Sequence, residues 1–516
     1  MTFDADAAYR AVTARDARFD GLWFVGVTST RIYCRPICRV RTPRRENCRF
    51  FDTPAQAEAA AFRPCLKCRP EIAPGAGVRW TVMDASKTLA LQAADELDRY
   101  AGRDEDLGLA QIADRLGVSD RHLRRIFAAE HGVTPLQYLQ TRRLLLAKQL
   151  LTDTRLPIAQ VALTSGFRSL RRFNAAFAHS YRMSPSRLRG DAAEEAPNAD
   201  DGVTVSLAYR APYDVAALLQ FIAQRAVPGV EAVGTAPENA GSVNAPDQFT
   251  VRRTLRAGTV APEAGWIEAR FVPHADRVKL RFAPQWAGAS GRIVAAARLW
   301  LDLDASPQVI DAALADLPGA PGLRLPGSLD AFELSVRAIL GQQVTVAAAR
   351  TLARRVVERF GTPIATPWPD IARAFPQPAR LAAAPVEEIA ELGIIRTRAN
   401  AIVAMAQAWP TLAVVLKCGT RASTQAPPDE LIAQLCALPG IGPWTAHYIA
   451  MRALGWPDAF PPNDVAVLKA MKQRFDAGTQ RAAEQRAEAW RPWRAYAVLR
   501  LWNSLSPPAP PPETSP

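Results

Sequence analysis

Residues 438–446 read Leu438-Pro439-Gly440-Ile441-Gly442-Pro443-Trp444-Thr445-Ala446. Segments with helical periodicity lie on both sides, from residue 428 to 435 and from residue 444 to 454. Gly440 and Gly442 permit a tight turn, and the free backbone N–H groups at the start of the second helix can hold a phosphate. These residues predict a helix-hairpin-helix that binds the backbone of a nucleic acid.

An aspartate follows this motif. Asp464 ends the segment Phe460-Pro461-Pro462-Asn463-Asp464, twenty positions after Trp444 (464 − 444). An aspartate after two prolines is, by itself, typical of a helix N-cap. The hairpin motif alone also occurs in DNA-binding proteins that are not enzymes, so it indicates binding rather than catalysis.

The motif and the aspartate together resemble the helix-hairpin-helix DNA glycosylase superfamily, and more specifically the AlkA-type alkylbase glycosylases. The resemblance spans essentially residues 203–505 and includes residues 211–214, 338–346 and 491–502. It implies that Asp464 is catalytic and that N-alkylated bases such as 3-methyladenine are flipped out of the duplex and excised. The implied base pocket contains four aromatic residues: Trp444, Tyr448, Trp502 and Phe221.

Two positions define the subclass that the resemblance implies. Trp444 occupies the place where bifunctional relatives have a Schiff-base lysine, so we expect a monofunctional enzyme that leaves an abasic site and needs no cofactor. Gln343 falls where a leucine wedge fills the gap left by the flipped base. A glutamine fills space but carries the cost of burying an amide.

Four of the seven cysteines form two pairs, Cys34-x3-Cys38 and Cys65-x2-Cys68. Two such pairs can close a tetrahedral zinc site, although the long spacer between them leaves a cluster of free thiols as an alternative. We expect a structural role for Cys48, and buried or incidental thiols at Cys418 and Cys436.

The segments 20–27, 31–38, 45–51 and 62–71 resemble the N-terminal domain of Ada. The resemblance implies a Zn²⁺ ion that is structural and also activates a nucleophile, with Cys34 accepting the methyl group of a DNA methylphosphotriester. Methylation would remove a negative charge beside the DNA and tighten binding. Nearby arginines are expected at phosphates unless they are only solvated: Arg35, Arg39, Arg41, Arg44 and Arg45.

Residues 109–127 and 157–174 read as two helix-turn-helix units, with Gly117 and Gly166 at the turns. Two copies about fifty residues apart, followed by Met183–Arg189, resemble the AraC-type DNA-binding domain. Base or phosphate contacts are expected from the second helix of each unit: Arg121, Arg124, Arg125, Arg168, Ser169, Arg171, Arg172 and Asn174. We find no Pro-Cys-His-Arg motif for repair of O6-methylguanine.

The chain has 516 residues and a formal net charge of +13, which favours a polyanionic partner. Apolar stretches fall short of the ~18 residues that a membrane span needs, and the acidic N-terminus lacks a signal-peptide core. We therefore expect a cytoplasmic, bacterial nucleoid-associated protein. Its expected partners are double-stranded DNA, both alkylated and promoter DNA, and RNA polymerase, with no membrane.

These blocks predict a multidomain α+β protein. The expected order is a small zinc-binding Ada-like domain (1–76), an all-α AraC-type double helix-turn-helix (84–189) and an acidic linker (190–202). A mixed α/β, TBP-like domain (203–287), an all-α helix-hairpin-helix glycosylase domain (288–505) and a Pro-rich disordered tail (506–516) follow. Alternation predicts strands at 203–207 and 266–272.

Three functions remain open from the residues. The first is a methylation-switched transcription activator fused to an active glycosylase. The second is a regulator whose C-terminal half only grips DNA. The third is a glycosylase with a vestigial sensor, which the complete cysteine quartet and both helix-turn-helix copies oppose.

Overall fold

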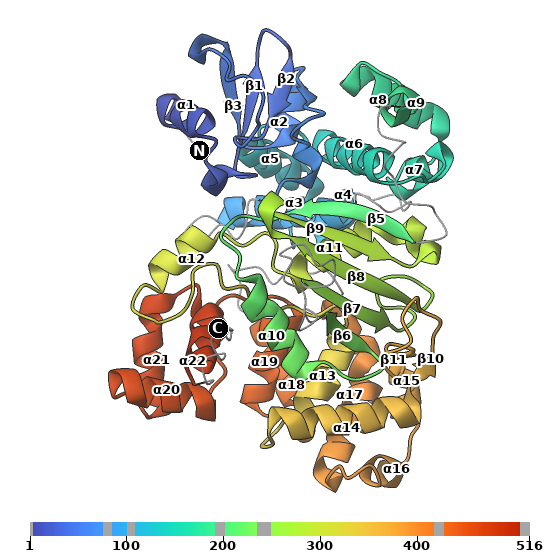
Figure 1. Ribbon diagram of the computed structural model, residues 1–516, viewed down its shortest axis with the longest axis vertical. Coiled ribbons are helices and arrows are strands. Elements are labelled where there is room, and N and C mark those ends of the chain that lie inside the picture. Colours follow the sequence, from blue (N-terminus) through green and yellow to red (C-terminus); the bar gives the residue numbers. More distant parts are fainter. Residues whose placement is uncertain are drawn as a thin grey trace, which may run out of the picture.

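The computed structural model describes residues 4–75, 85–100, 109–190, 202–234, 249–416 and 428–505. Nearly all of the expected acidic linker, the Pro-rich tail and Cys418 lie outside these residues. Four groups of elements follow one another along the chain (Figure 1). Within the described ranges, no helix combines the length and apolar character that crossing a membrane requires.

The cysteine unit, residues 4–75, is built on a small sheet of strand order β3-β1-β2-β4. β1 pairs antiparallel with β2 and β3, whereas β2 and β4 run parallel. The elements are α1 (Ala5–Ala14), η1 (Ala17–Phe19), β1 (Phe24–Val27), β2 (Ile32–Cys34), η2 (Arg45–Asn47), β3 (Cys48–Phe51), α2 (Pro54–Ala59), β4 (Arg63–Pro64) and η3 (Pro70–Ile72).

The two-repeat unit, residues 85–190, is entirely helical where described. Gly117 and Gly166 have φ of +69° and +79°, which confirms the predicted left-handed turns. Ser119 and Ser169 cap the second helix of each repeat. The helices are α3 (Ala85–Tyr100), α4 (Leu109–Arg115), α5 (Asp120–His131), α6 (Pro135–Asp153), α7 (Ile158–Thr164), α8 (Leu170–Tyr181) and α9 (Pro185–Gly190).

The sheet unit, residues 202–300, contains an antiparallel sheet of order β5-β9-β8-β7-β6. Both predicted strands are present, as β5 and β8. The elements are β5 (Val203–Ala208), α10 (Val215–Arg225), β6 (Glu231–Gly234), β7 (Thr250–Leu255), β8 (Gly265–Val272), η5 (Pro273–Ala275), β9 (Arg277–Phe282), η6 (Pro284–Ala289) and α11 (Ser290–Trp300).

One hydrophobic core joins the sheet unit to the two-repeat unit. Ile293 and Trp300 of α11 are buried together with the sheet. Phe173 and Phe177 of α8 belong to the same core as Leu280 of β9. Because the sheet unit and the two-repeat unit share a hydrophobic core, they pack against each other as one body.

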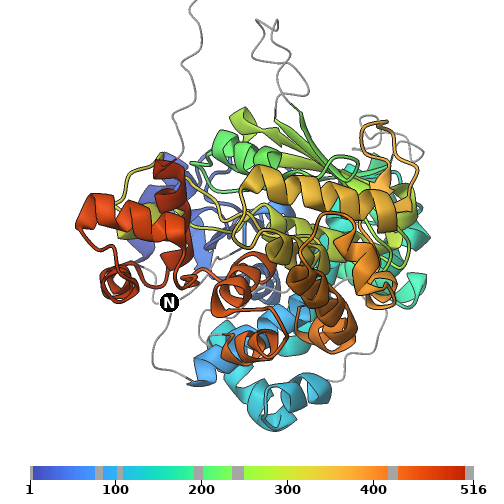
Figure 2. The same ribbon diagram turned by 90° about the horizontal axis from the view of Figure 1, so that it is seen from below.

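The hairpin unit, residues 305–505, consists mainly of helices and divides into two lobes. Figures 1 and 2 both show α20, α21 and α22 grouped apart from α13, α14 and α17. The elements are α12 (Pro307–Ala313), α13 (Ala331–Leu340), α14 (Val346–Phe360), β10 (Thr362–Pro363), β11 (Arg373–Ala374), α15 (Pro378–Ala382), α16 (Val386–Ala390), α17 (Arg396–Val415), α18 (Asp429–Cys436), α19 (Pro443–Ala453), α20 (Val465–Phe475), α21 (Gln480–Ala487), η7 (Glu488–Trp490) and α22 (Arg494–Ser504).

Helix α19 lies at the seam between the lobes. Ala446 and Ile449 are buried in the core of one lobe, while Ala450 and Met451 are buried in the core of the other. The helix begins at the predicted hairpin, with Gly442 as its N-cap and Pro443 as its first residue. The sequence motif therefore stands where the two lobes meet.

Candidate functional site

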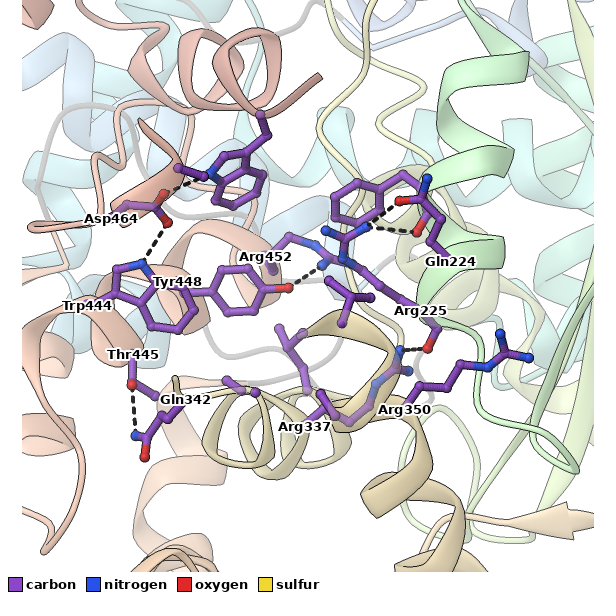
Figure 3. Close-up of a pocket in the computed structure, with 18 of the residues that line it drawn as sticks. Gln224, Arg225, Arg337, Gln342, Arg350, Trp444, Thr445, Tyr448, Arg452 and Asp464 are labelled. Carbon is purple, nitrogen blue, oxygen red and sulfur yellow. Dashed lines mark hydrogen bonds between the residues drawn. The ribbon is translucent and has the colours of Figure 1, made fainter. Parts of the chain in front are cut away.

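A large cavity opens at this seam. Its volume is about 1920 Å³, and its walls come from α10, α13, α14, α19, α20, α22 and the loops beside them. In Figure 3, Trp444 and Tyr448 lie at one end of the cavity and Arg225, Arg337 and Arg350 lie at the other. The cavity therefore lies between the sheet unit, which contributes α10, and the hairpin unit.

Asp464 lies in the cavity wall and is 6% exposed. It caps α20, because its Oδ1 accepts a hydrogen bond from the backbone N–H of Val467 at 2.8 Å. The indole N–H of Trp444 donates to Oδ2 at 2.8 Å, and that of Trp502 donates to Oδ1 at 3.1 Å. The carboxylate is thus a helix cap and a cavity residue at once.

The four aromatic residues expected in a pocket all line this cavity. Trp444 and Tyr448 are stacked, with ring centroids 5.3 Å apart and planes 7° from parallel. The Trp502 ring is also near Tyr448, with ring centroids 6.3 Å apart and planes tilted by 44°. Phe221 reaches the cavity from α10 in the sheet unit. Electron-rich ring faces beside a carboxylate suit a flat, cationic ligand.

Two guanidinium groups lie close to the aromatic rings of Phe221 and Tyr448. Arg452 donates to the Tyr448 hydroxyl at 2.8 Å and lies 4.8 Å from the centroid of the Phe221 ring. Arg225 lies 3.8 Å from the same ring. Burial alone would raise the pKa of Tyr448, but the charges of Arg452, Arg225 and Arg337 outweigh it and lower that pKa. This end of the cavity is cationic.

The hairpin before α19 is fixed from two directions. Gly440 has φ of +77°, and a Cβ there would come within 2.9 Å of the Ala401 Cβ in α17. The Gln342 side-chain amide donates to the Gly440 carbonyl at 2.9 Å and to the Thr445 hydroxyl at 3.0 Å. The loop between α13 and α14 is therefore bonded to the hairpin.

The mouth of the cavity carries exposed apolar side chains. Val465, the residue after Asp464, is 82% exposed, and Ile395 and Val346 are also exposed at the same opening. Gln343 is exposed there with φ of +52°, a left-handed conformation that is uncommon for a glutamine. Exposed apolar side chains around an opening suit contact with a large ligand that lies across the cavity mouth.

Four thiols gather at one end of the small sheet. Cys34 ends β2, Cys65 follows β4, and with Cys38 and Cys68 their sulfurs lie within 4.8 Å of one another. Sulfurs bound at about 2.3 Å to one tetrahedral ion lie roughly 3.8 Å apart, so the cluster fits a zinc-sized ion. Cys48 is buried outside this cluster, with its sulfur 3.4 Å from the Arg44 carbonyl.

Arg35 does not lie where the sequence suggested. We expected it at DNA phosphates, but it is 2% exposed and its guanidinium binds the Asp20 carboxylate and, at 3.1 Å, the Cys68 carbonyl. That expectation is wrong, because the folded sheet brings a buried carboxylate beside it. Arg39 is exposed, and Arg45 is half-buried and paired with Asp6 at 2.9 Å.

The second helices of the two repeats present the expected polar residues. On α5, Arg124 bonds to Asp120 at 3.0 Å, and Arg125 lies 3.3 Å from the His122 ring. Ser169 uses its hydroxyl to cap α8, so its side chain already has a partner. The remaining side chains of the set are exposed: Arg121, Arg124, Arg125, Arg168, Arg171, Arg172 and Asn174.

Four further residues line the cavity although no sequence motif pointed to them: Arg225, Arg337, Gln342 and Arg452. The sequence held a clue to Arg225 and Arg452, because they follow the pocket residues Phe221 and Tyr448 by four positions. This i, i+4 spacing places two side chains on the same face of a helix. Arg337 and Gln342 reach the site only through the packing of α13 against α10 and α19.

Four family models match the chain in order. The metal binding domain of Ada matches residues 7–71, and a helix-turn-helix domain matches residues 112–191. The AlkA N-terminal domain matches residues 204–330, and the HhH-GPD superfamily of base excision DNA repair proteins matches residues 336–495.

Curated relatives cover the whole chain or its halves. A probable bifunctional transcriptional activator/DNA repair enzyme AlkA of Mycobacterium tuberculosis is 34% identical over 98% of both chains. DNA-3-methyladenine glycosylase 2 of Escherichia coli is 35% identical over 58% of this chain and 96% of its own. The bifunctional activator/repair enzyme AdaA of Bacillus subtilis is 30% identical over 36% and 82%, respectively.

Proposed function

The chain belongs to the family of bifunctional transcriptional activators and DNA repair enzymes, and from this membership we propose a specific division of labour. The hairpin and sheet units form a monofunctional DNA glycosylase that excises N-alkylated bases, with 3-methyladenine as the reference substrate. The cysteine and two-repeat units form a methylphosphotriester sensor that activates transcription.

One observation carries the glycosylase proposal: Asp464 is held by Trp444 and Trp502 inside the aromatic cavity. Three N–H donors hold its two oxygens, so the carboxylate has a fixed orientation toward the space where a base and its sugar would lie. A 3-methylated adenine is cationic, and stacking on Trp444 and Tyr448 would favour it over a neutral base.

In the proposed reaction, the bond from C1′ to the base nitrogen breaks and its electron pair leaves with the base. The bond electrons neutralise the cationic base, while positive charge develops on the sugar. A carboxylate at Asp464 stabilises that charge, and water adds to C1′ and loses a proton. The products are a free base and an abasic site.

We assign no strand cleavage to this chain. Strand cutting of the bifunctional type needs an amine that forms a Schiff base with C1′, and an indole cannot form one. Trp444, in the first turn of α19, occupies the position where such an amine would be required, and its indole N–H donates to Asp464.

The cysteine unit would hold zinc through Cys34, Cys38, Cys65 and Cys68, whose donor chemistry and spacing fit that ion. A bound Zn²⁺ keeps coordinated thiols deprotonated and nucleophilic. In the proposed transfer, the Cys34 sulfur attacks the methyl carbon of a phosphotriester. The S–C bond forms as the C–O bond breaks, and the phosphate leaves as a diester anion.

The two-repeat unit would then carry the sequence-specific contacts. We propose that α5 and α8 enter successive major grooves of promoter DNA, with Arg121, Arg124, Arg125, Arg168, Arg171, Arg172 and Asn174 at bases or phosphates. Gly440 and Gly442 would hold a phosphate of damaged DNA at the hairpin. Activation of transcription would bring the two-repeat unit into contact with RNA polymerase.

The deciding experiment is release of 3-methyladenine from methylated duplex DNA by the purified full chain, beside Asp464→Asn. We expect release by the native chain, loss of about a hundredfold or more in the variant, and no strand cutting by either. The amide keeps the size of the side chain but not its charge. Equal melting temperatures of the two proteins would exclude unfolding as the cause.

Absence of base release from folded, DNA-binding native protein would contradict the glycosylase proposal. The C-terminal half would then be a non-catalytic DNA-binding part of a transcription regulator. Strand cutting after base release would contradict the monofunctional assignment alone.

A further inference from the structure

Arg210 is buried where the cysteine unit, the sheet unit and the hairpin unit meet. It belongs to the sheet unit and is 1% exposed, and its guanidinium donates to main-chain carbonyls of the cysteine unit and of residues 304 and 305. Nε donates to Asp20 at 2.9 Å, Nη1 donates to Asp304 at 2.7 Å, and Nη2 donates to Gly75. Burial lowers the pKa of Arg210 to about 10, yet it remains cationic at neutral pH.

Asp20 is held from its other side by the cysteine site. Its carboxylate binds Arg35, the residue after Cys34, and Arg35 also donates to the Cys68 carbonyl at 3.1 Å. Asp20 is therefore fixed between Arg35 and Arg210. The position of its backbone depends on the segment that carries the cysteines.

Arg210 also begins the segment that leads to the base pocket. The Arg324 guanidinium donates to the carbonyls of Arg210 and Pro212 and stacks 4.4 Å from the Tyr213 ring centroid. Asp214 follows and caps α10 through the backbone N–H of Ala217 at 2.9 Å. Helix α10 carries Phe221 and Arg225 into the cavity (Figure 3).

A separate contact of the cysteine unit does not lead to α10. The Gln56 side-chain amide donates to the His131 carbonyl of α5, in the two-repeat unit, at 3.0 Å. Arg298 is not independent in this way, because it pairs with the Asp304 carboxylate at 3.4 Å while Arg210 donates to the Asp304 carbonyl. Gln56 therefore provides the control for the docking contact.

We propose that the cysteine unit is a built-in positioning partner of the base pocket, in which Asp20 docks on Arg210 and Arg210 sets the segment that orients α10 and Phe221. Arg210 is a positioning residue, since it acts through α10 and touches no substrate. The proposal rests on the glycosylase function proposed above. It predicts that the pocket and the segment 20–35 stabilise each other, because coupling between two sites is reciprocal.

Arg210→Lys in the full chain is the test, because lysine keeps the buried cation but cannot reach the four carbonyl groups that the forked guanidinium binds. We expect single-turnover release of 3-methyladenine from methylated duplex to slow about tenfold. The affinity for an undamaged duplex should change less than about twofold, because the hairpin is untouched. Gln56→Leu removes a bond between the cysteine and two-repeat units and should match the native chain in both measurements.

Hydrogen exchange gives an independent reading that does not require the variant to fold. A duplex with an abasic-site analogue, bound to the native chain, should slow exchange of the backbone amides in residues 20–35 more than an undamaged duplex of the same sequence does. Unchanged exchange there would overturn the proposal, as would native-rate base release by Arg210→Lys. Equal losses of rate and of duplex affinity in that variant would also overturn it. Absence of base release by the native chain would instead refute the glycosylase function, and exchange would still decide the docking.

Discussion

The indole N–H of Trp444 donates to Oδ2 of Asp464 at 2.8 Å, joining the first turn of α19 to the N-cap of α20. Trp444 therefore orients the carboxylate. Because Trp502 binds the other oxygen at 3.1 Å, two indoles from different helices set its plane. The indole of Trp444 therefore has a role of its own at this position, which is to hold the Asp464 carboxylate in place.

Trp444→Phe should separate orientation from stacking. Phenylalanine keeps an aromatic face beside Tyr448 but has no N–H for Asp464, and a hydrogen bond to a charged group is worth about 1.5–3 kcal/mol. We expect single-turnover base release to fall about tenfold or more. Trp490→Phe is the control, since it removes an indole bond of 3.0 Å to Asp316 outside the cavity. Equal effects of the two substitutions would refute this role for Trp444.

Metal content should distinguish the four clustered cysteines from Cys48. Cys38→Ala removes one of the sulfurs that lie within 4.8 Å of each other, whereas Cys48→Ala removes a buried thiol outside the cluster. We expect the native chain and Cys48→Ala to retain one zinc per chain after dialysis, and Cys38→Ala to lose most of it. Retention of a full equivalent by Cys38→Ala would contradict the assigned ligand set.

Much of the site could be predicted from the sequence because it depends on local geometry. A glycine with positive φ, a proline that starts α19 and a cysteine pair that closes a turn are constraints within a few residues. The placement of Asp464 beside Trp444 was reachable only through the resemblance to a family, since the spacing alone equally fits a helix cap.

The parts that could not be predicted depend on packing between distant segments. Arg35 lies in an arginine-rich run and reads as a surface residue, but Asp20 is brought beside it and both are buried. Arg210 likewise carries no motif, and its partners Asp20, Gly75 and Asp304 come from three separate regions of the chain. Buried cations of this kind follow from tertiary structure, not from periodicity.

Stability should depend on pH through Glu58. Its carboxylate lies between the cysteine and two-repeat units, accepts hydrogen bonds from Tyr33 and Thr141, and is so buried that its pKa rises from 4.5 to about 8. The folded chain therefore holds this proton longer than the unfolded chain. The free energy of unfolding should be greatest below about pH 4.5 and should decrease toward pH 8, by at most about 1.4 kcal/mol per unit.

Glu58→Gln should remove this part of the pH dependence, since the amide does not ionise. The measurement is urea unfolding at pH 5.5 and pH 8, followed by circular dichroism. Glu391→Gln is the control, because Glu391 is exposed and its substitution should leave the pH dependence unchanged. A native slope in Glu58→Gln would mean that another group carries the proton.

Salt dependence should reveal the part that α8 takes in DNA binding. Arg172→Ala removes an exposed cation from α8, so the slope of log affinity against log salt should decrease in magnitude by about 1. Arg380→Ala, on exposed α15, should leave the slope unchanged. Fluorescence anisotropy with a labelled duplex measures both, and equal slopes for the two variants would exclude α8 from the interface.

Substitution of Gln343 tests how the protein keeps the flipped nucleotide outside the DNA duplex. It is exposed at the cavity mouth, in a loop that Gln342 bonds to the hairpin, with φ of +52°. We propose that it fills the gap left by the base, so Gln343→Ala should slow base release from fully paired duplex about tenfold. The loss should be smaller opposite a mismatch, where extrusion of the base costs less.

Length and backbone strain must be separated in this test, because glutamine is uncommon at positive φ. Asparagine adopts left-handed conformations more readily but is one methylene shorter, so Gln343→Asn relieves strain and shortens the side chain. If reach matters, Gln343→Asn should behave like Gln343→Ala, and Gln343→Leu should match or exceed the native rate because no amide is buried. If Gln343→Asn keeps the native rate, the side chain does not fill the duplex and the loop acts only through its backbone.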